Sequence, residues 1–161
     1  MTPGADGALF VRLADSSMCG RLAAIHGAAF DKEGWDADSF AQLLAQDGTR
    51  ALVAVETGQE PIACGFVLVR IAADEAEILT LAVVPARRRE RIATRLVDSA
   101  KRYVAAGGAR ALFLEVATDN TPARLLYDAL GFSQVGLRRG YYERKGALPA
   151  DAILMRCALA T

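Results

Sequence analysis

The chain has 161 residues, of which 53% are hydrophobic, and this length fits one domain with a sizeable apolar core better than two. Nineteen basic and nineteen acidic side chains give a formal net charge of zero, so charge offers no argument for nucleic-acid or membrane partners. Three scattered cysteines and a single histidine argue against a metal site, and the lack of a signal-peptide pattern or a long apolar run predicts a cytoplasmic protein with one domain over residues 1–161.

The first part of the chain predicts one strand and two helices. Leu9–Leu13 reads as a short apolar strand, and Asp15 with Ser16 supplies side chains that commonly begin a helix. A second helix is expected from about Asp38. The apolar residues at helical spacing are Leu22, Ile25, Ala29 and Phe30 in the first helix, and Phe40, Leu43 and Leu44 in the second.

Three strands are expected next. Residues 51–55 and 62–71 are apolar, and residues 57–61 between them have the composition of a hairpin turn. Residues 76–84 are too apolar for a strand with one solvated face, which predicts a central strand. Pro85 lies just after its end, where a missing N–H costs no ladder hydrogen bond.

A helical period replaces the strand pattern after this point. Gly107 and Gly108 are expected to end the helix, because glycine accepts positive φ. Residues 111–116 then form a buried strand that carries one carboxylate, Glu115. The apolar stripe of the helix consists of Ile92, Leu96, Val97, Ala100, Tyr103 and Val104.

A short helix and a final hairpin complete the chain. Asn120 or Thr121 can cap the helix, and Gly131 ends it. Residues 132–137 are expected to pair with residues 152–159. The order β, α, α, β, β, β, α, β, α, β, β predicts an α/β (α+β) domain, a mixed sheet with helices packed on its faces.

A strand–turn–helix unit over residues 79–96 is suited to binding phosphate. A helix start directs unpaired N–H groups and a partial positive charge outward. The turn over residues 87–93 also carries four arginines, which can add charge-assisted hydrogen bonds. Without further signals, four arginines at a helix start are more often a solvated basic surface than a phosphate site.

Two residues further along are candidate acid–base groups. Glu115 lies at the end of an apolar strand, where desolvation makes a carboxylate a better base. Its position alone also fits an exposed strand end or a structural hydrogen bond. Tyr127 falls in the helix that folds back beside this strand, and its spacing alone favours packing with the hydroxyl in water.

Residues 77–93 resemble the acetyl-CoA-binding strand, loop and helix of the GNAT superfamily of N-acetyltransferases. The family loop reads Gln/Arg-x-x-Gly-x-Gly/Ala, so Arg88 matches its first position and Ala93 its last, whereas Arg91 stands where the first glycine is expected. Further segments are similar to the RimI group, the ribosomal-protein alanine N-acetyltransferases. They are residues 114–116 with Asn120 and 126–132, which match its catalytic strand and helix, and residues 138–142 and 151–155, which match its substrate hairpin.

This resemblance implies a GNAT fold and a role for each matching residue. The fold is a mixed, mostly antiparallel sheet of six to seven strands, split between the strands near Val83 and Glu115 and flanked by about four helices. Acetyl-CoA would lie in the split, with Glu115 as general base, Tyr127 as general acid and no covalent enzyme intermediate. The implied cofactor-binding residues are Leu81, Ala82, Val83, Arg88, Arg89, Glu90, Arg91, Ile92, Ala93, Thr94, Asn120 and Tyr127, and the substrate-binding residues are Trp35, Arg138, Tyr141 and Tyr142.

The implied acceptor is a protein or peptide N-terminus, in particular the N-terminal alanine of a small-subunit ribosomal protein. We expect no nucleic-acid or membrane partner and a monomer or weak dimer. Two alternatives stay open. One is a GNAT enzyme for another amine, such as a small molecule, a lysine or a different N-terminus. The other is a non-catalytic binding module, because arginine in place of the loop glycine costs on the order of 1 kcal/mol at positive φ and its Cβ can crowd a pyrophosphate.

Overall fold

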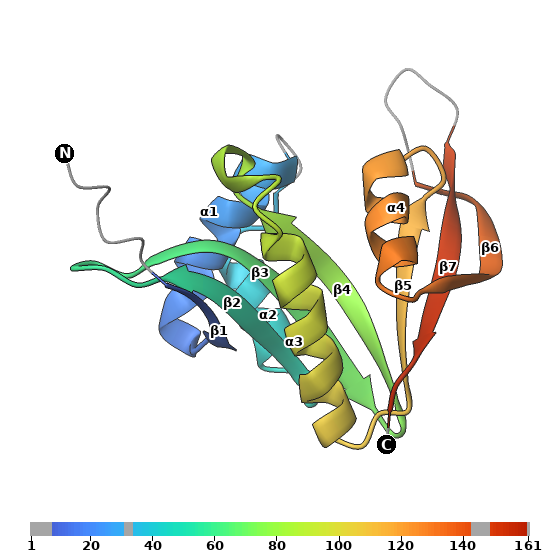
Figure 1. The fold of residues 1–161 in the computed structure, drawn as a ribbon, viewed down its shortest axis with the longest axis horizontal. Coiled ribbons are helices and arrows are strands. Elements are labelled where there is room, and N and C mark those ends of the chain that lie inside the picture. Colours follow the sequence, from blue (N-terminus) through green and yellow to red (C-terminus); the bar gives the residue numbers. More distant parts are fainter. Residues whose placement is uncertain (1–7, 31–33, 143–148, 161) are drawn as a thin grey trace. The chain divides into compact units, whose positions relative to one another are not determined.

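The computed structural model describes residues 8–30, 34–142 and 149–160. The described residues form seven strands, four α-helices and short 3-10 turns (Figure 1). The strands are β1 (Leu9–Leu13), β2 (Thr49–Glu56), β3 (Ile62–Ala72), β4 (Glu75–Val83), β5 (Ala111–Ala117), β6 (Ser133–Tyr142) and β7 (Ala150–Ala158). The helices are α1 (Cys19–Phe30), α2 (Ala37–Leu44), α3 (Ile92–Ala106) and α4 (Thr121–Ala129), with 3-10 turns η1 (Ser16–Met18) and η3 (Pro85–Arg87).

The strands hydrogen-bond in the order β1-β2-β3-β4-β5-β7-β6. β4 and β5 run parallel, whereas β1–β2, β2–β3, β5–β7 and β7–β6 are antiparallel. This confirms the predicted mixed, mostly antiparallel sheet, and β4 occupies the predicted central place in the order. By packing, the chain divides into two compact units.

The first unit contains the described residues of Met1–Arg70 and Leu79–Ala100. Both faces of β2 and β3 are covered, which explains why their sequences are continuously apolar rather than alternating. α1 and α2 lie on one face and α3 on the other (Figure 1). The core on the α1–α2 side is built from residues that are each at most 1% exposed: Leu22, Ile25, Phe40, Val53, Phe66 and Leu68.

A bulge interrupts the pairing of β2 with β3. Ala54 pairs with Gly65 whereas Val55 pairs with Ala63, so Cys64 is the additional residue on β3. The Cys64 carbonyl accepts a hydrogen bond of 2.9 Å from the N–H of Val84, just beyond the end of β4. The bulge therefore fixes the point at which β4 leaves the sheet and the chain turns towards α3.

The second unit contains Ile71–Ile78 and the described residues of Lys101–Thr161. Here Glu75–Glu77 pair in parallel with Ala111–Phe113, and β5 pairs along its whole length with β7. Gly108, at φ 99°, ends α3 as predicted. The N–H of Arg110 then donates to the Asp74 carbonyl at 2.7 Å, which sets the start of β5.

Most sequence-predicted elements are confirmed, with small shifts at their ends. β1 coincides with the predicted strand, and the final hairpin is longer than expected because β6 extends to Tyr142. α2 begins at Ala37 rather than near Asp38, because the Asp36 side chain accepts from the Ser39 N–H and caps the helix one residue earlier. For α4, the cap is Asn120 rather than Thr121.

Candidate active site

The connection between β4 and α3 is a strained turn. η3 follows β4, and Arg89 and Arg91 then adopt left-handed conformations with φ of 68° and 60°. Such conformations cost a non-glycine residue about 1 kcal/mol each, so the surrounding contacts must hold them. Arg91 thus occupies the backbone geometry that the family loop reserves for glycine, and its side chain is exposed.

Arg87 supplies one of those contacts. Its guanidinium group donates to Glu56 on β2 at 2.5 Å and to Glu90 at 2.8 Å. These two carboxylates raise the pKa of Arg87 well above its usual value, first through the hydrogen bond to Glu90. Arg87 therefore connects the turn to β2, and the carboxylates of Glu56 and Glu90 neutralise its charge.

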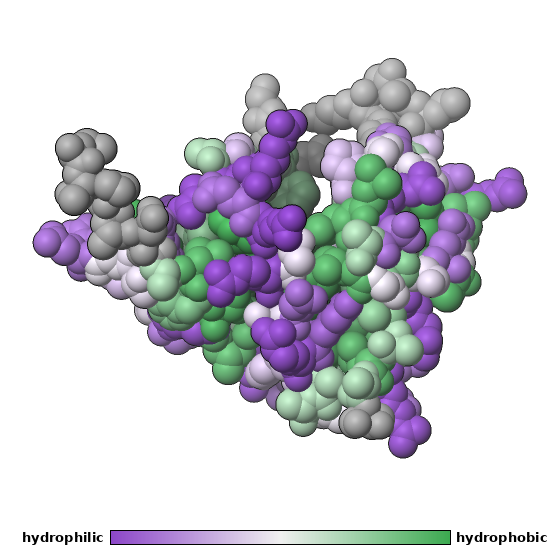
Figure 2. All heavy atoms as spheres, viewed as in Figure 1, coloured by the Kyte–Doolittle hydropathy of each residue, from purple (hydrophilic) through white to green (hydrophobic). Residues whose placement is uncertain are grey.

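The other arginines of the turn are exposed. Arg88 contacts the carbonyl of Ala29 on α1 at 3.4 Å, and Arg89 and Arg91 face solvent. Figure 2 shows hydrophilic side chains gathered over the connection between η3 and α3. The predicted cationic surface is therefore present, carried by three arginines rather than four.

The first turn of α3 offers backbone donors beside this surface. The helix ladder begins with the N–H of Arg95 donating to the Arg91 carbonyl at 3.1 Å. Helix geometry therefore leaves the N–H groups of Ile92, Ala93 and Thr94 without an acceptor inside the helix. Together with the helix dipole, they form an anion-binding geometry of the kind that holds phosphate groups.

Gly65 lets the start of α3 sit close to the sheet. A Cβ at this position would lie 3.0 Å from the Ala82 carbonyl oxygen, 3.2 Å from Leu96 and 3.3 Å from Ile92. Any side chain larger than hydrogen would push α3 away from β3 and β4. The position of the helix start therefore depends on this glycine.

β4 presents part of its backbone on the side away from β3. The N–H of Val84 points to β3, where it meets the Cys64 carbonyl. Because successive residues of a strand direct their N–H and C=O groups to opposite sides, those of Leu81 and Val83 point away from β3. Ala82 is buried, and its carbonyl oxygen lies on the Gly65 side.

In the second unit, Glu115 is a partly buried carboxylate. It sits on β5 opposite Leu154 of β7, and its side chain is 24% exposed. The Arg138 guanidinium, on β6, lies 3.3 Å from its Oε1 and is 60% exposed. Glu115 is thus neither a solvated strand end nor a fully buried charge. Its carboxylate forms an ion pair with a cationic side chain.

Tyr127 is 7% exposed, and the end of α4 holds it in place. The N–H of Phe132 donates to the Tyr127 carbonyl at 3.0 Å and that of Gly131 to the Asp128 carbonyl at 3.1 Å, with Gly131 at φ 91°. This is a Schellman motif, and the Phe132 ring packs edge-on against Tyr127 at 5.5 Å as its hydrophobic contact. The Lys101 ammonium group bonds the Leu130 carbonyl and lies 5.3 Å from the Phe132 ring centre.

The protonation state of Tyr127 follows from this burial. Desolvation raises the pKa of its phenol well above the ordinary value of 10.0, and the nearby Tyr142 raises it further. The phenol therefore keeps its proton throughout the neutral range. That is the protonation state which a hydrogen-bond donor or general acid requires.

The residues predicted to bind substrate divide between the two units. Arg138, Tyr141 and Tyr142 lie together on β6: the Arg138 guanidinium is 5.2 Å from the Tyr141 ring, which packs edge-on against Tyr142 at 5.0 Å. The second unit thus gathers this group with Glu115 and Tyr127. The side-chain oxygen of Asn120 caps α4 by accepting from the Ala123 N–H at 3.3 Å.

Trp35 instead belongs to an aromatic cluster of the first unit. It stacks on His26 at 4.7 Å, and its N–H donates to His26 Nδ1 at 3.0 Å. Phe30 and Phe40 also pack on His26. The structure gives Trp35 a packing role, and its contact with substrate stays a prediction.

Of three further residues that shape the site, two have no signature in the sequence and one has a local signal. Arg87 looks like its three neighbours until its partner Glu56, 31 positions earlier, is known. Gly65 lies in a strand pattern, where an isolated glycine signals a bulge or a close backbone approach, so that signal was available. Lys101 is an ordinary exposed position of an amphipathic helix in sequence.

Comparison with known proteins agrees with this geometry. A sequence model of the Acetyltransferase (GNAT) family matches residues 18–132. The [ribosomal protein bS18]-alanine N-acetyltransferase of Haemophilus ducreyi is 34% identical over 113 residues, which are 70% of this chain and 77% of that protein. A putative enzyme of the same name from Bacillus subtilis is 34% identical over 122 residues, 75% of this chain and 77% of that protein.

The fold also matches a solved structure. The crystal structure of the ribosomal-protein-S18-alanine N-acetyltransferase from Escherichia coli superposes with a TM-score of 0.85 at 23% identity, covering 96% of both chains. Within the described ranges, every helix is too short or too polar to cross a membrane.

Proposed function

Because this chain belongs to the Acetyltransferase (GNAT) family, with RimI-like relatives, and is an acetyl-CoA-dependent N-acetyltransferase, we propose that its acceptor is the α-amine of a protein N-terminus. The specific acceptor we propose is the N-terminal alanine of the small-subunit ribosomal protein bS18, the substrate named for the relatives from Haemophilus and Escherichia coli. The observation that supports the proposal is that one unit contains both a partly buried Glu115 paired with a cation and a buried tyrosine, Tyr127, that keeps its proton.

The residues of the first unit fit the cosubstrate. Acetyl-CoA supplies an activated acetyl group as a thioester. Its pyrophosphate would be held by the N–H groups at the start of α3, with Arg88, Arg89 and Arg91 adding positive charge. The outward-pointing backbone groups of Leu81 and Val83 would bind the pantetheine arm as a neighbouring strand would. A backbone N–H near Val83 can polarise the thioester carbonyl.

The residues of the second unit fit the proton transfers. The acceptor arrives as an ammonium ion, because an α-amine has a pKa of about 8. Arg138 shows that the Glu115 carboxylate accepts a cation at 3.3 Å, and the acceptor ammonium would take a similar place. Glu115, directly or through a water, then removes one proton, and the neutral amine attacks the thioester carbonyl. As the C–S bond breaks, Tyr127 donates its proton to the leaving thiolate, and the second proton lost by the new amide nitrogen restores the tyrosine. Tyr141 and Tyr142 would border the peptide.

Direct attack without a covalent enzyme intermediate is the form of reaction we propose. The three cysteines are buried. Cys64 is the cysteine whose carbonyl contacts Val84 at the end of β4. Burial raises the pKa of its thiol, which keeps the thiol protonated and a poor nucleophile.

Peptide acetylation tests the acceptor. Synthetic peptides with the bS18 N-terminal sequence, differing only in a first residue of alanine, serine, glycine or methionine, are incubated with acetyl-CoA and analysed by mass spectrometry. A matched peptide with a blocked α-amine and a free lysine is the control. We expect acetylation at the α-amine, fastest for alanine. Equal acetylation of the blocked peptide would transfer the assignment to lysine, and no preference for alanine would remove bS18 as the acceptor.

A further inference from the structure

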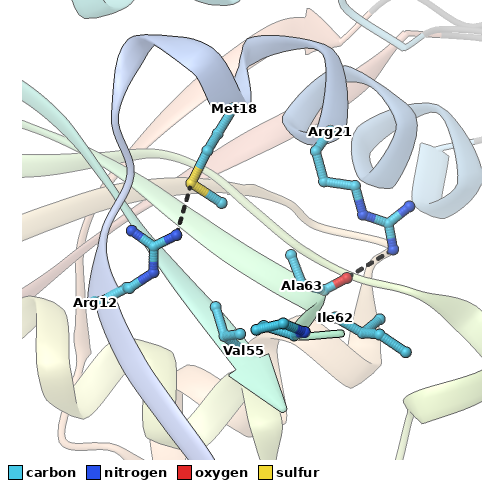
Figure 3. A pocket seen from close by; sticks show the side chains of 7 residues that line it. Arg12, Met18, Arg21, Val55, Ile62 and Ala63 are labelled. Atoms are coloured by element: carbon cyan, nitrogen blue, oxygen red, sulfur yellow. Dashed lines mark hydrogen bonds between the residues drawn. The ribbon is translucent and has the colours of Figure 1, made fainter. Parts of the chain in front are cut away.

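A small pocket of the first unit lies apart from every residue assigned above. It has a volume of about 230 Å³ and is formed by β1, η1, α1 and the facing ends of β2 and β3. Its walls include the side chains of Arg12, Met18, Arg21, Val55 and Ile62. Figure 3 shows the guanidinium groups of Arg12 and Arg21 on opposite sides of Ala63.

Both arginines are held in place by weak or partial partners. Arg21 donates through Nη2 to the Ala63 carbonyl at 2.8 Å. Arg12 donates to the Leu13 carbonyl at 3.3 Å and, on its other terminal nitrogen, to the sulfur of Met18 at 3.5 Å. A thioether is a weak acceptor for a charged donor. A guanidinium group has five N–H donors, so both side chains retain capacity for an anion.

Among the described residues that line the pocket there is no Asp or Glu, so they supply no negative charge to match these two cations. The acidic group that interacts with Arg12 is Asp15, outside the lining. Its Oδ1 already accepts from the N–H of Ser17 at 2.9 Å and from the Ser17 hydroxyl, which lower the pKa of Asp15. Two positive charges therefore face a pocket whose own polar groups do not neutralise them.

The rest of the lining is apolar. Val55 and Ala63 are 3% and 7% exposed and form part of the lining, whereas Ile62 is 54% exposed at its edge. A volume of about 230 Å³ lies below the 300–1,000 Å³ typical of sites for drug-sized ligands. This excludes a nucleotide or a folded peptide segment as the fitting occupant and favours a small molecule.

We propose that this pocket binds a small organic anion, a carboxylate with a short aliphatic body. The forked guanidinium groups of Arg12 and Arg21 match the two oxygens of a carboxylate. The aliphatic body contacts Val55, Ile62 and the Met18 side chain. This binding is independent of the proposed acetyl transfer, because none of these residues belongs to the acetyl-CoA or acceptor site.

Met18 provides a built-in reporter, because its sulfur contacts Arg12. The chain has three methionines, so protein labelled with ¹³C at the methionine methyl groups gives a simple spectrum. Met18→Leu assigns the reporter signal. Met155, in the second unit, serves as an internal reference for folding. The probes are sodium butyrate, butylamine hydrochloride and sodium phosphate at constant ionic strength.

We expect butyrate to shift the Met18 methyl signal with saturation in the millimolar range, as suits a ligand of six non-hydrogen atoms. Arg12→Gln and Arg21→Gln should each raise the dissociation constant by about threefold to tenfold. Arg50→Gln removes an arginine of the same unit that donates to the Thr49 carbonyl at 2.7 Å and is not among the lining residues, so it should leave the dissociation constant unchanged.

Three results would overturn the proposal. A Met18 shift that rises without saturation, or is as large with butylamine, shows that no anion site exists. Equal binding in the two pocket variants and in Arg50→Gln removes the arginines from it. Tighter binding of phosphate than of butyrate contradicts the role given to the apolar lining. A variant in which the Met155 signal moves is misfolded, and Arg12→Lys or Arg21→Lys then replaces it. The same weakening of butyrate binding is expected, because lysine lacks the forked pair of donors of a guanidinium group.

Discussion

Gly65→Ala should loosen the start of α3 and with it the acetyl-CoA site. The added Cβ would lie 3.0 Å from the Ala82 carbonyl oxygen, and the next contacts are Leu96 at 3.2 Å and Ile92 at 3.3 Å. The nearest atom belongs to the backbone of a central strand, so it cannot move aside as a flexible side chain would. The helix start must therefore move outward, away from the position that the glycine allows.

The size of the effect follows from two opposing terms. Overpacking of this kind costs about 1–3 kcal/mol, and replacing glycine by alanine returns about 0.4–1 kcal/mol by restricting the unfolded chain. The net loss lies between about 0 and 2.6 kcal/mol, and its midpoint of about 1.3 kcal/mol corresponds to a fall in Tm of roughly 3–5 °C for a chain of this length. Gly20→Ala is the matched control, because no atom lies within 4 Å of its added Cβ and the position is already helical.

Thermal unfolding and calorimetry with acetyl-CoA together test this reasoning. Gly65→Ala should unfold at a lower temperature and bind acetyl-CoA more weakly, whereas Gly20→Ala should match or exceed the wild type in both. A Gly65→Ala protein that unfolds at the wild-type temperature and binds acetyl-CoA normally would refute the claim that this glycine sets the position of α3. A loss of stability without a loss of affinity would separate the packing of α3 from cosubstrate binding.

Three further outcomes are expected. Tyr127→Phe should lower turnover by about 10²–10⁴-fold with nearly unchanged acetyl-CoA affinity, whereas Tyr103→Phe should be neutral; full activity of the first variant excludes the acid role. Glu115→Gln should slow acetylation most at low pH, where the amine carries its proton, and a loss independent of pH would indicate positioning instead. Burial lowers the pKa of His26 below its usual 6.5, so the unfolded chain takes up a proton first and the free energy of unfolding should fall as pH drops below about 6.5. Urea unfolding at several pH values should show a smaller fall for His26→Gln, and an equal fall would assign the effect to other groups.

The sequence predicts the elements well because each carries its own local signal. The hairpin of β2 and β3 follows from two apolar runs with turn residues between them, and Gly131 marks the end of α4 where the backbone needs positive φ. These signals lie within a few residues of the structure they specify. Element ends differ where a capping side chain such as Asp36 begins a helix one residue earlier, and where strand pairing extends beyond the apolar run, as in β6.

The site was predicted less completely, because its contacts join distant positions. Four arginines of one turn are indistinguishable in sequence, yet within the described part of the chain it is Arg87 that is paired with two carboxylates. Similarly, Trp35 is an isolated aromatic residue in sequence, and its stack on His26 joins positions that are nine residues apart. The resemblance to the family supplied the roles of Glu115 and Tyr127, which their spacing did not.

The left-handed geometry of Arg91 explains how this loop can do without the glycine that the family pattern contains. Glycine would relieve about 1 kcal/mol of backbone strain, but it would also leave the unfolded chain freer by about 0.4–1 kcal/mol. The two quantities nearly cancel, so exchanging one residue for the other is close to thermodynamically neutral. The turn can therefore carry a cationic side chain at this position, where we propose that a diphosphate binds, at almost no loss of folding stability.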